Sequence, residues 1–320
     1  MKMNRILDSA RFVIENSDFV KINKERVVQF SAGFDHGKAE HWLSAAPFDF
    51  SNLTEDEKLH FLFIFNSLSF SYWGEPKWTV HYKDMQYDGA WGLIVALDKA
   101  IKNGTKLLDF KFCSKISLDE FKRILEANVE IPLLKERWKI LHEIGENMAN
   151  KYGGRVRNLI NEANNDAPKL LDLILQNFSS FQDTAVYKGK EVYFQKRAQL
   201  FVADVFQIFD GEGFGMLNKV DTITACADYK LPQVLRKLGV FEYEPSLSEK
   251  IDGKIELIHN SPEEVEIRAN TIWAVEFIKE EVKKHSPDIM SFEINDHLWL
   301  ATQEKFPDDK PYHRTRTTAY

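Results

Sequence analysis

Helix-start signals, repeated along the chain, constrain its fold more than any other feature of the sequence. Thr54, Ser117 and Ser261 each stand three residues before a glutamate and just ahead of an apolar stretch. In such a capping box the hydroxyl and the glutamate each accept a backbone N–H at the helix start. The pattern predicts a helix after each of the three residues. A fourth amphipathic run, from Leu133 to Tyr152, ends in a glycine pair that is typical of a helix stop.

Strand signals are few by comparison. Residues 78–82 and a glycine-centred hairpin over 185–193 are the main candidates. Residues 211–215 contain three glycines, but they lack the spacing and the lysine of a phosphate-binding loop, and we interpret them as a connection. Strands do not alternate with helices, and no repeat occurs. We predict a mainly α fold with a small β element, in one compact domain over residues 1–320 with two helical lobes and the site between them.

Charge and apolar patterning narrow the class of partner. The chain has 42 basic and 49 acidic residues, a net charge of −7, and no basic stripe that would attract a long nucleic acid. The longest apolar runs, residues 61–65 and 91–97, are too short to span a bilayer. Two cysteines, Cys113 and Cys226, do not make a disulfide framework. We expect a cytoplasmic monomer that acts on a small molecule, without direct contact with nucleic acid or membrane.

Histidines and aromatic residues are further candidates for ligand binding. His36 and His41 lack the glutamate of a His-Glu-x-x-His motif, and the other histidines are scattered. We therefore expect neither a metal nor an organic cofactor. Aromatic residues make up 13% of the chain. Most of them belong in the core, but such a surplus also suits a pocket for a flat, stackable ligand.

Carboxylates offer more chemistry. Asp228 stands in a stretch of small, mostly uncharged residues where a helix begins. The simpler interpretation is a helix cap. The alternative is a carboxylate, held ionised by amide donors, that stabilises a cation forming on a ligand. Upstream, Lys196 and Arg197 precede an apolar helix and are either a solvated helix start or part of a site.

Two later segments carry further polar groups. Asp296 and His297 stand beside leucine and tryptophan in residues 294–299. The segment 311–320 contains several hydroxyl groups and three potentially basic side chains, which are His313, Arg314 and Arg316. This segment is either a frayed terminus or an ordered tail that touches a phosphate.

Taken together, these segments resemble the queuosine salvage protein family over nearly the whole chain. Residues 69–75, Ser-Phe-Ser-Tyr-Trp-Gly-Glu, resemble the family's Asn-Phe-Ser-Phe-Trp-Ser-Glu segment, with Ser69 in place of asparagine. Cys226 stands where an aromatic residue is common. Each segment alone is a weak signal, whereas the ordered set is specific. The other matching segments are residues 87–91, 136–137, 152–154, 196–199, 227–235, 264–268 and 313–316.

The resemblance implies a fold and an activity. The fold would be similar to helix–hairpin–helix DNA glycosylases, whose Lys…Asp signature Lys196 and Asp228 resemble. The activity would be hydrolysis of the N-glycosidic bond of queuosine 5′-monophosphate, which yields queuine and ribose 5-phosphate. Cleavage of such a bond builds positive charge on the ribose. Asp228 would be the catalytic carboxylate, which stabilises this charge, attacks the anomeric carbon or orients the water.

The resemblance also implies roles for other residues. Queuine is a 7-deazaguanine without a basic N7, so its departure depends on the carboxylate and on hydrogen bonds to the leaving base. The base-binding candidates are Asp296, Cys226, Tyr229, His297, Phe70 and Trp73. The phosphate-binding candidates are Lys196, Arg197, His313, Arg314 and Arg316. Two alternatives stay open: a protein that carries queuine or queuosine without turnover, and a glycosylase acting on nucleic-acid bases.

Overall fold

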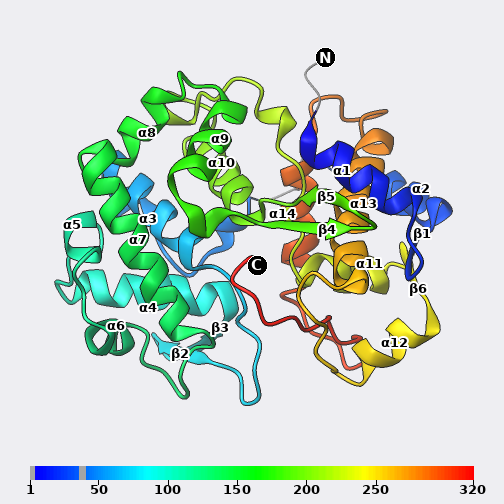
Figure 1. The fold of residues 1–320 in the computed structure, drawn as a ribbon, viewed down its shortest axis with the longest axis horizontal. Coiled ribbons are helices and arrows are strands. Elements are labelled where there is room, and N and C mark those ends of the chain that lie inside the picture. Colours follow the sequence, from blue (N-terminus) through cyan, green and yellow to red (C-terminus); the bar gives the residue numbers. More distant parts are fainter. Residues whose placement is uncertain (1–3, 36–40) are drawn as a thin grey trace.

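The computed structural model describes residues 4–35 and 41–320 and consists mainly of helices (Figure 1). The mainly α prediction with a small β element is confirmed. None of the helices in the described ranges is both long and apolar enough to cross a membrane. The helices are α1 Arg5–Glu15, α2 Lys24–Ala32, α3 Glu55–Leu68, α4 Gly89–Lys102, α5 Phe110–Cys113, α6 Leu118–Ile124, α7 Leu134–Tyr152, α8 Val156–Glu162, α9 Ala167–Asn177, α10 Lys196–Ile208, α11 Lys230–Lys237, α12 Pro245–Asp252, α13 Pro262–Val282 and α14 Ser291–Ala301. Short 3-10 helices are η2 Trp42–Ala45, η3 Phe50–Asn52, η4 Ser179–Phe181, η5 Gly213–Gly215 and η6 Val220–Thr222, and the strands are β1 Val20–Ile22, β2 Thr79–Tyr82, β3 Met85–Asp88, β4 Thr184–Tyr187, β5 Lys190–Tyr193 and β6 Phe241–Tyr243.

The predicted helix starts form as their capping chemistry requires. At the start of α3, the Glu57 N–H donates to Thr54 Oγ1 at 3.3 Å, and the Thr54 N–H donates to Glu57 Oε2 at 2.9 Å. Ser117 and Ser261 cap α6 and α13 by accepting the N–H of the residue three positions on. The helix α7 ends at Gly153, whose φ of 61° is the left-handed conformation that glycine adopts without strain.

Within the described residues, the strands form three two-stranded antiparallel sheets. The β4–β5 hairpin was expected from the sequence, and β2 forms in the strand candidate at residues 78–82, whose pairing with β3 was not predicted. The third pairs β1 with β6, so that Val20 lies opposite Tyr243 and Ile22 opposite Phe241. The sequence did not predict this pairing, because two three-residue strands from distant parts of the chain carry no local signal.

The central helix α13 joins two large clusters of buried apolar side chains. Val265 and Trp273 belong to the cluster that α3, α4 and α7 to α10 build. Ile267, Val275 and Ile278 belong to the cluster that α2, α11, α12 and α14 build. Apolar side chains all around a helix are typical of a buried one. Figure 1 shows the two groups of helices on either side of the molecule, with the β4–β5 hairpin extending from one toward the other.

Residues 311–320 run between the two groups of helices, and the C-terminus lies near the centre of the molecule (Figure 1). The Ser71 N–H donates to the Tyr320 carbonyl at 2.8 Å, and the Ser71 hydroxyl donates to the Thr317 carbonyl at 2.6 Å. The side chains of His313, Thr317 and Tyr320 are buried. The frayed-terminus interpretation is therefore wrong, because this segment packs into the protein.

Candidate active site

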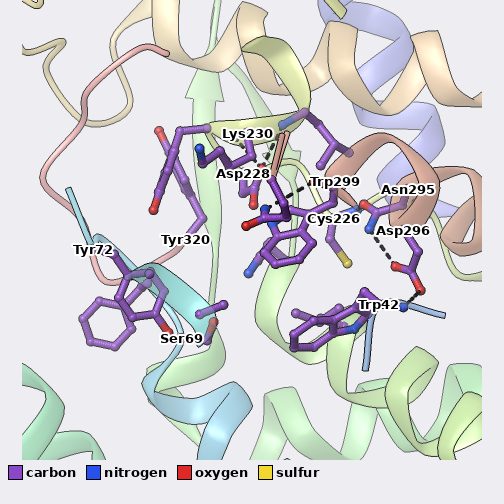
Figure 2. Close-up of a pocket in the computed structure, with 18 of the residues that line it drawn as sticks. Trp42, Ser69, Tyr72, Cys226, Asp228, Lys230, Asn295, Asp296, Trp299 and Tyr320 are labelled. Atoms are coloured by element: carbon purple, nitrogen blue, oxygen red, sulfur yellow. Dashed lines mark hydrogen bonds between the residues drawn. The ribbon is translucent and has the colours of Figure 1, made fainter. Parts of the chain in front are cut away.

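A pocket forms where α3, α10, α14 and the start of α11 approach the C-terminal segment. Residues far apart in the sequence line it, among them Trp42, Tyr72, Lys196, Asp228, Asp296 and Trp299. Figure 2 shows Asp296 and Trp42 at one end of the pocket, Tyr72 and Ser69 at the other end, and Asp228 between them. The two ends of this pocket, called below the Asp296 end and the Tyr72 end, differ in chemistry.

Asp228 both caps a helix and lines the pocket. Its Oδ1 accepts the backbone N–H of Lys230 at 2.7 Å and of Leu231 at 3.1 Å, at the first turn of α11. Burial raises the pKa of Asp228, while the positive charge of Lys196 and the two amide donors act in the opposite direction. The capping and functional interpretations are compatible, because the cap fixes the carboxylate at the pocket surface.

Lys196 and Arg197 begin α10, and both are buried, so the interpretation as a solvated helix start is wrong. Lys196 lines the pocket, and its positive charge acts on Asp228, Asp204 and the thiol of Cys226. Arg197 points elsewhere: its guanidinium donates to main-chain carbonyls and lies 5.2 Å from the ring centroid of Phe70. Arg197 does not line the pocket. Its predicted direct contact with a phosphate has no support in this geometry.

At the Asp296 end, Asn295 connects α14 to the segment before Asp228. The Cys226 N–H donates to Asn295 Oδ1 at 2.9 Å, and Asn295 Nδ2 donates to Asp296 Oδ1 at 3.2 Å. Asp296 Oδ2 accepts from Gln207 Nε2 at 2.9 Å. Burial raises the pKa of Asp296 to about 8. Asp296 is therefore largely a neutral acid at pH 7, which both donates and accepts hydrogen bonds.

Three tryptophans form an aromatic wall beside Asp296. The Trp42 ring is stacked on Trp91 with centroids 5.4 Å apart. The Trp299 ring packs against both in T-shaped contacts, with its centroid 5.5 Å from that of Trp42 and 5.0 Å from that of Trp91. Trp42 and Trp299 line the pocket. The indole N–H of Trp42 donates to Asp204 Oδ1 at 2.8 Å, and burial raises the pKa of Asp204 to about 7. This wall offers flat apolar surface to an aromatic ligand.

Other predicted base-binding residues divide into two groups. Phe70, Cys226 and Tyr229 line the pocket. Trp73 does not; it packs beside Tyr229 in a small cluster, and its indole N–H donates to a main-chain carbonyl of the C-terminal segment. His297 lies on the other side of α14, with its ring 4.8 Å from that of Phe34. The predicted base contact of His297 therefore has no support in this arrangement.

The three basic residues of the C-terminal segment lie outside the pocket lining. Arg314 forms an ion pair with Glu75. Arg316 lies 3.6 Å over the Trp73 ring and donates to the Trp73 carbonyl at 3.2 Å. His313 is buried with Nε2 3.1 Å from the Tyr320 hydroxyl, and burial lowers its pKa to about 4, so the imidazole is neutral at pH 7. These contacts anchor the segment, and the predicted phosphate contacts of the three residues have no support here.

The histidines for which the sequence shows no metal-binding motif contribute no cluster in the described parts of the chain. His36 lies outside the described residues. His41 is held in a buried position that lowers its pKa to about 4. Within residues 4–35 and 41–320, no group of three or more His, Cys, Asp and Glu side chains is arranged to hold a metal ion.

Comparison with known proteins adds to this geometry. The family model described as queuosine salvage protein matches residues 50–320 of the chain. The chain belongs to the queuosine salvage protein family. A protein of Sphaerobacter thermophilus named queuosine 5′-phosphate N-glycosylase/hydrolase is 34% identical over 323 residues, which cover 98% of this chain and 97% of the relative. Proteins of the same name are 34% identical in Mus musculus, over 98% of both chains, and 31% identical in Schizosaccharomyces pombe, over 94% of this chain and 92% of the relative.

The family assignment confirms the resemblance found in the sequence, whereas the roles of individual residues stay predictions. Residues of the pocket that the sequence did not single out as binding residues include Trp42, Ser69, Tyr72, Asn295, Trp299 and Tyr320. Asn295 and Trp299 carried a weak signal, because they stand beside Asp296 in one segment. Trp42 carried none, since an isolated aromatic residue in a sequence is most often part of the core. Tyr72 stands in the family-like segment 69–75, but nothing in that resemblance distinguished it as a binding residue.

Proposed function

We propose that this queuosine salvage protein hydrolyses the N-glycosidic bond of queuosine 5′-monophosphate, releasing queuine and ribose 5-phosphate. Family membership and the names of its relatives support this activity. The observation that carries it is the position of Asp228. This buried carboxylate is fixed by two helix amides and stands between two chemically different ends of one pocket (Figure 2).

The reaction needs a negative charge beside the anomeric carbon. As the bond to the base breaks, its electron pair leaves with the base and the ribose gains oxocarbenium character. Asp228 faces and stabilises that cation, and a water molecule then adds to the anomeric carbon. One proton of that water is released from the new hydroxyl, and the departing base takes up a proton. Lys196 favours the ionised form of Asp228, because its positive charge opposes the effect of burial.

The Asp296 end suits the base. A 7-deazaguanine is flat and carries hydrogen-bond donors and an acceptor along one edge. Trp42 and Trp299 offer it aromatic surface, and Asp296 and Asn295 offer both kinds of hydrogen-bonding group. Because Asp296 is largely neutral at pH 7, it pairs with such an edge without an uncompensated buried charge.

The wider setting is part of the same proposal. The chain would work as a single domain over residues 1–320, with the substrate between two helical lobes that α13 connects. A net charge of −7 supports an activity without direct nucleic-acid contact. We place the enzyme in the cytoplasm as a monomer, and we keep its relation to helix–hairpin–helix DNA glycosylases as a proposed similarity of architecture.

The experiment is to incubate the purified chain with queuosine 5′-monophosphate, and separately with queuosine, and to detect queuine by mass spectrometry. Release of queuine from the monophosphate is the expected result. A folded protein that binds the monophosphate and releases no queuine from it would instead be a carrier. Removal of a base from an oligonucleotide, with the mononucleotide left intact, would favour the nucleic-acid glycosylase.

A further inference from the structure

The Tyr72 end of the pocket contains a buried hydroxyl without a hydrogen-bond partner. Tyr72 is 8% exposed and lines the pocket, and its Oη makes no hydrogen bond of normal geometry within the described residues. The Ser69 hydroxyl is its polar neighbour and belongs to the same lining (Figure 2). A buried hydroxyl left unpaired destabilises a fold, so such a group at a pocket surface points to an acceptor on a ligand.

The phenol of Tyr72 is suited to donate. Burial raises its pKa to about 12, so the hydroxyl keeps its proton at neutral pH. Its segment is also held rigidly. Ser71 has a φ of 35°, in the left-handed region that costs a serine conformational energy, and the Ser71 N–H donates to the Tyr320 carbonyl at 2.8 Å. The backbone thus holds Tyr72 in a strained segment at the pocket, which is a feature typical of binding sites.

Two buried guanidinium groups lie behind this part of the wall. The Arg137 guanidinium lies 4.1 Å from the ring centroid of Phe70 and 5.3 Å from that of Tyr72, and Arg197 lies 5.2 Å from Phe70. Both donate to main-chain carbonyls, so no hydrogen-bonded carboxylate cancels their charge. Burial lowers the pKa of each to about 10, and both stay charged at pH 7. The two guanidinium groups therefore place positive charge behind the Tyr72 end, although neither of them lines the pocket.

We propose that Tyr72 and Ser69 recognise the phosphate monoester of the substrate through hydrogen bonds from their hydroxyls, in the positive field of Arg137 and Arg197. This inference rests on the proposed function, since it places the ribose 5-phosphate at the Tyr72 end and the base at the Asp296 end. Asp228 lies between the two ends of the pocket (Figure 2). The anomeric carbon likewise lies between the base and the phosphate in the substrate. Hydrogen bonds from neutral donors to a charged acceptor are among the stronger ones in proteins.

The test uses the two products as separate probes of the two ends. Isothermal titration calorimetry would give the dissociation constants of ribose 5-phosphate and of queuine for the wild-type chain and for Tyr72→Phe and Ser69→Ala. Loss of one hydrogen bond to a charged group predicts a rise of about ten- to a hundredfold for ribose 5-phosphate in Tyr72→Phe. The dissociation constant of queuine should change less than twofold. Tyr152→Phe is the matched control, because Tyr152 is buried against Phe178 outside the pocket.

Two results would overturn the inference. One is a wild-type chain that does not bind ribose 5-phosphate, or a Tyr72→Phe variant that binds it as tightly as the wild type does. The other is an equal weakening for ribose 5-phosphate and queuine, which would indicate a general structural effect. Because both titrations measure binding without turnover, a wild-type chain that binds ribose 5-phosphate but fails to release queuine would contradict the proposed function alone.

Discussion

Arg268 of α13 binds Asp183 through two parallel hydrogen bonds, Nη1 to Oδ1 at 2.8 Å and Nη2 to Oδ2 at 2.6 Å. The third nitrogen, Nε, donates to the carbonyl of Ala227 at 3.1 Å. Asp183 Oδ2 also accepts the N–H of Lys196 at 3.0 Å. One fully buried ion pair thus fixes both the start of α10 and the residue before Asp228. This ion pair therefore sets the position of Lys196 relative to Asp228.

Replacement of Asp183 by asparagine should destabilise the fold, and the site with it. The change leaves the buried Arg268 charge without the carboxylate that it binds through two hydrogen bonds, and Glu264, 3.7 Å away, stays as a more distant partner. Removal of one member of a buried pair costs about 3–5 kcal/mol. Urea denaturation should show that loss. The matched control is Asp252→Asn, which breaks the half-exposed pair with Arg236 and should change stability by no more than about 1 kcal/mol. Equal effects of the two substitutions would contradict the structural role assigned to Asp183.

Replacement of Lys196 by methionine should move the acid limb of the pH–rate profile. The positive charge of Lys196 favours the ionised form of Asp228, so its removal raises the pKa of that carboxyl further. Asp228 must be ionised to act, and the acid limb of kcat/KM should therefore shift to higher pH. Lys196→Arg keeps the charge and should keep the limb near its original position. An acid limb that stays at the same pH in Lys196→Met would show that this charge does not act on the catalytic group.

Replacement of Asp296 by asparagine should change how stability depends on pH. The pKa of Asp296 is about 8 in the folded protein against an ordinary 3.8, so the folded state binds more protons between these values. The free energy of unfolding of the wild type accordingly falls as the pH rises through this window. Asparagine does not titrate. Thermal melts from pH 5 to 8 should show that the variant gains stability relative to the wild type as the pH rises. If the stabilities of the two proteins instead changed in parallel with pH, Asp296 would already be ionised in this range.

Replacement of Trp299 by alanine should weaken binding of the base. Stacking of a base on an aromatic side chain contributes about 1–3 kcal/mol, so the dissociation constant of queuine should rise about tenfold or more. The affinity for ribose 5-phosphate should change little, because Trp299 belongs to the wall at the Asp296 end. Calorimetric titration with both compounds measures the two effects. A loss confined to ribose 5-phosphate would reverse the assignment of the two ends.

The sequence predicted those parts of the fold that depend on near neighbours. The helix start at Thr54 needs only a glutamate three residues on, and the helix end at Gly153 needs only one glycine. The pairing of β1 with β6 depends on tertiary packing instead. The division of the core into two clusters around α13 likewise depends on which face of a helix meets which partner.

The site residues were predictable where the residue type alone determines the chemistry. They were not predictable where the role of a residue depends on its surroundings in the fold. Asp228 and Asp296 were singled out as acids in unusual surroundings, and both line the pocket. Arg197 was expected to bind phosphate because of its charge, but its donors are used by main-chain carbonyls. Tyr72 belongs to the family-like segment 69–75 but was not singled out within it. Only the three-dimensional packing shows that its hydroxyl is buried at the pocket without a partner.

The central claim is that Asp228 supplies the negative charge that the reaction needs. The most direct test is single-turnover release of queuine from queuosine 5′-monophosphate by the wild type and by Asp228→Asn, with the affinity for the substrate measured in parallel. The account predicts a rate lower by about three orders of magnitude or more, with a dissociation constant that changes only a few-fold. A release rate within about tenfold of the wild type, in a folded variant, would contradict it.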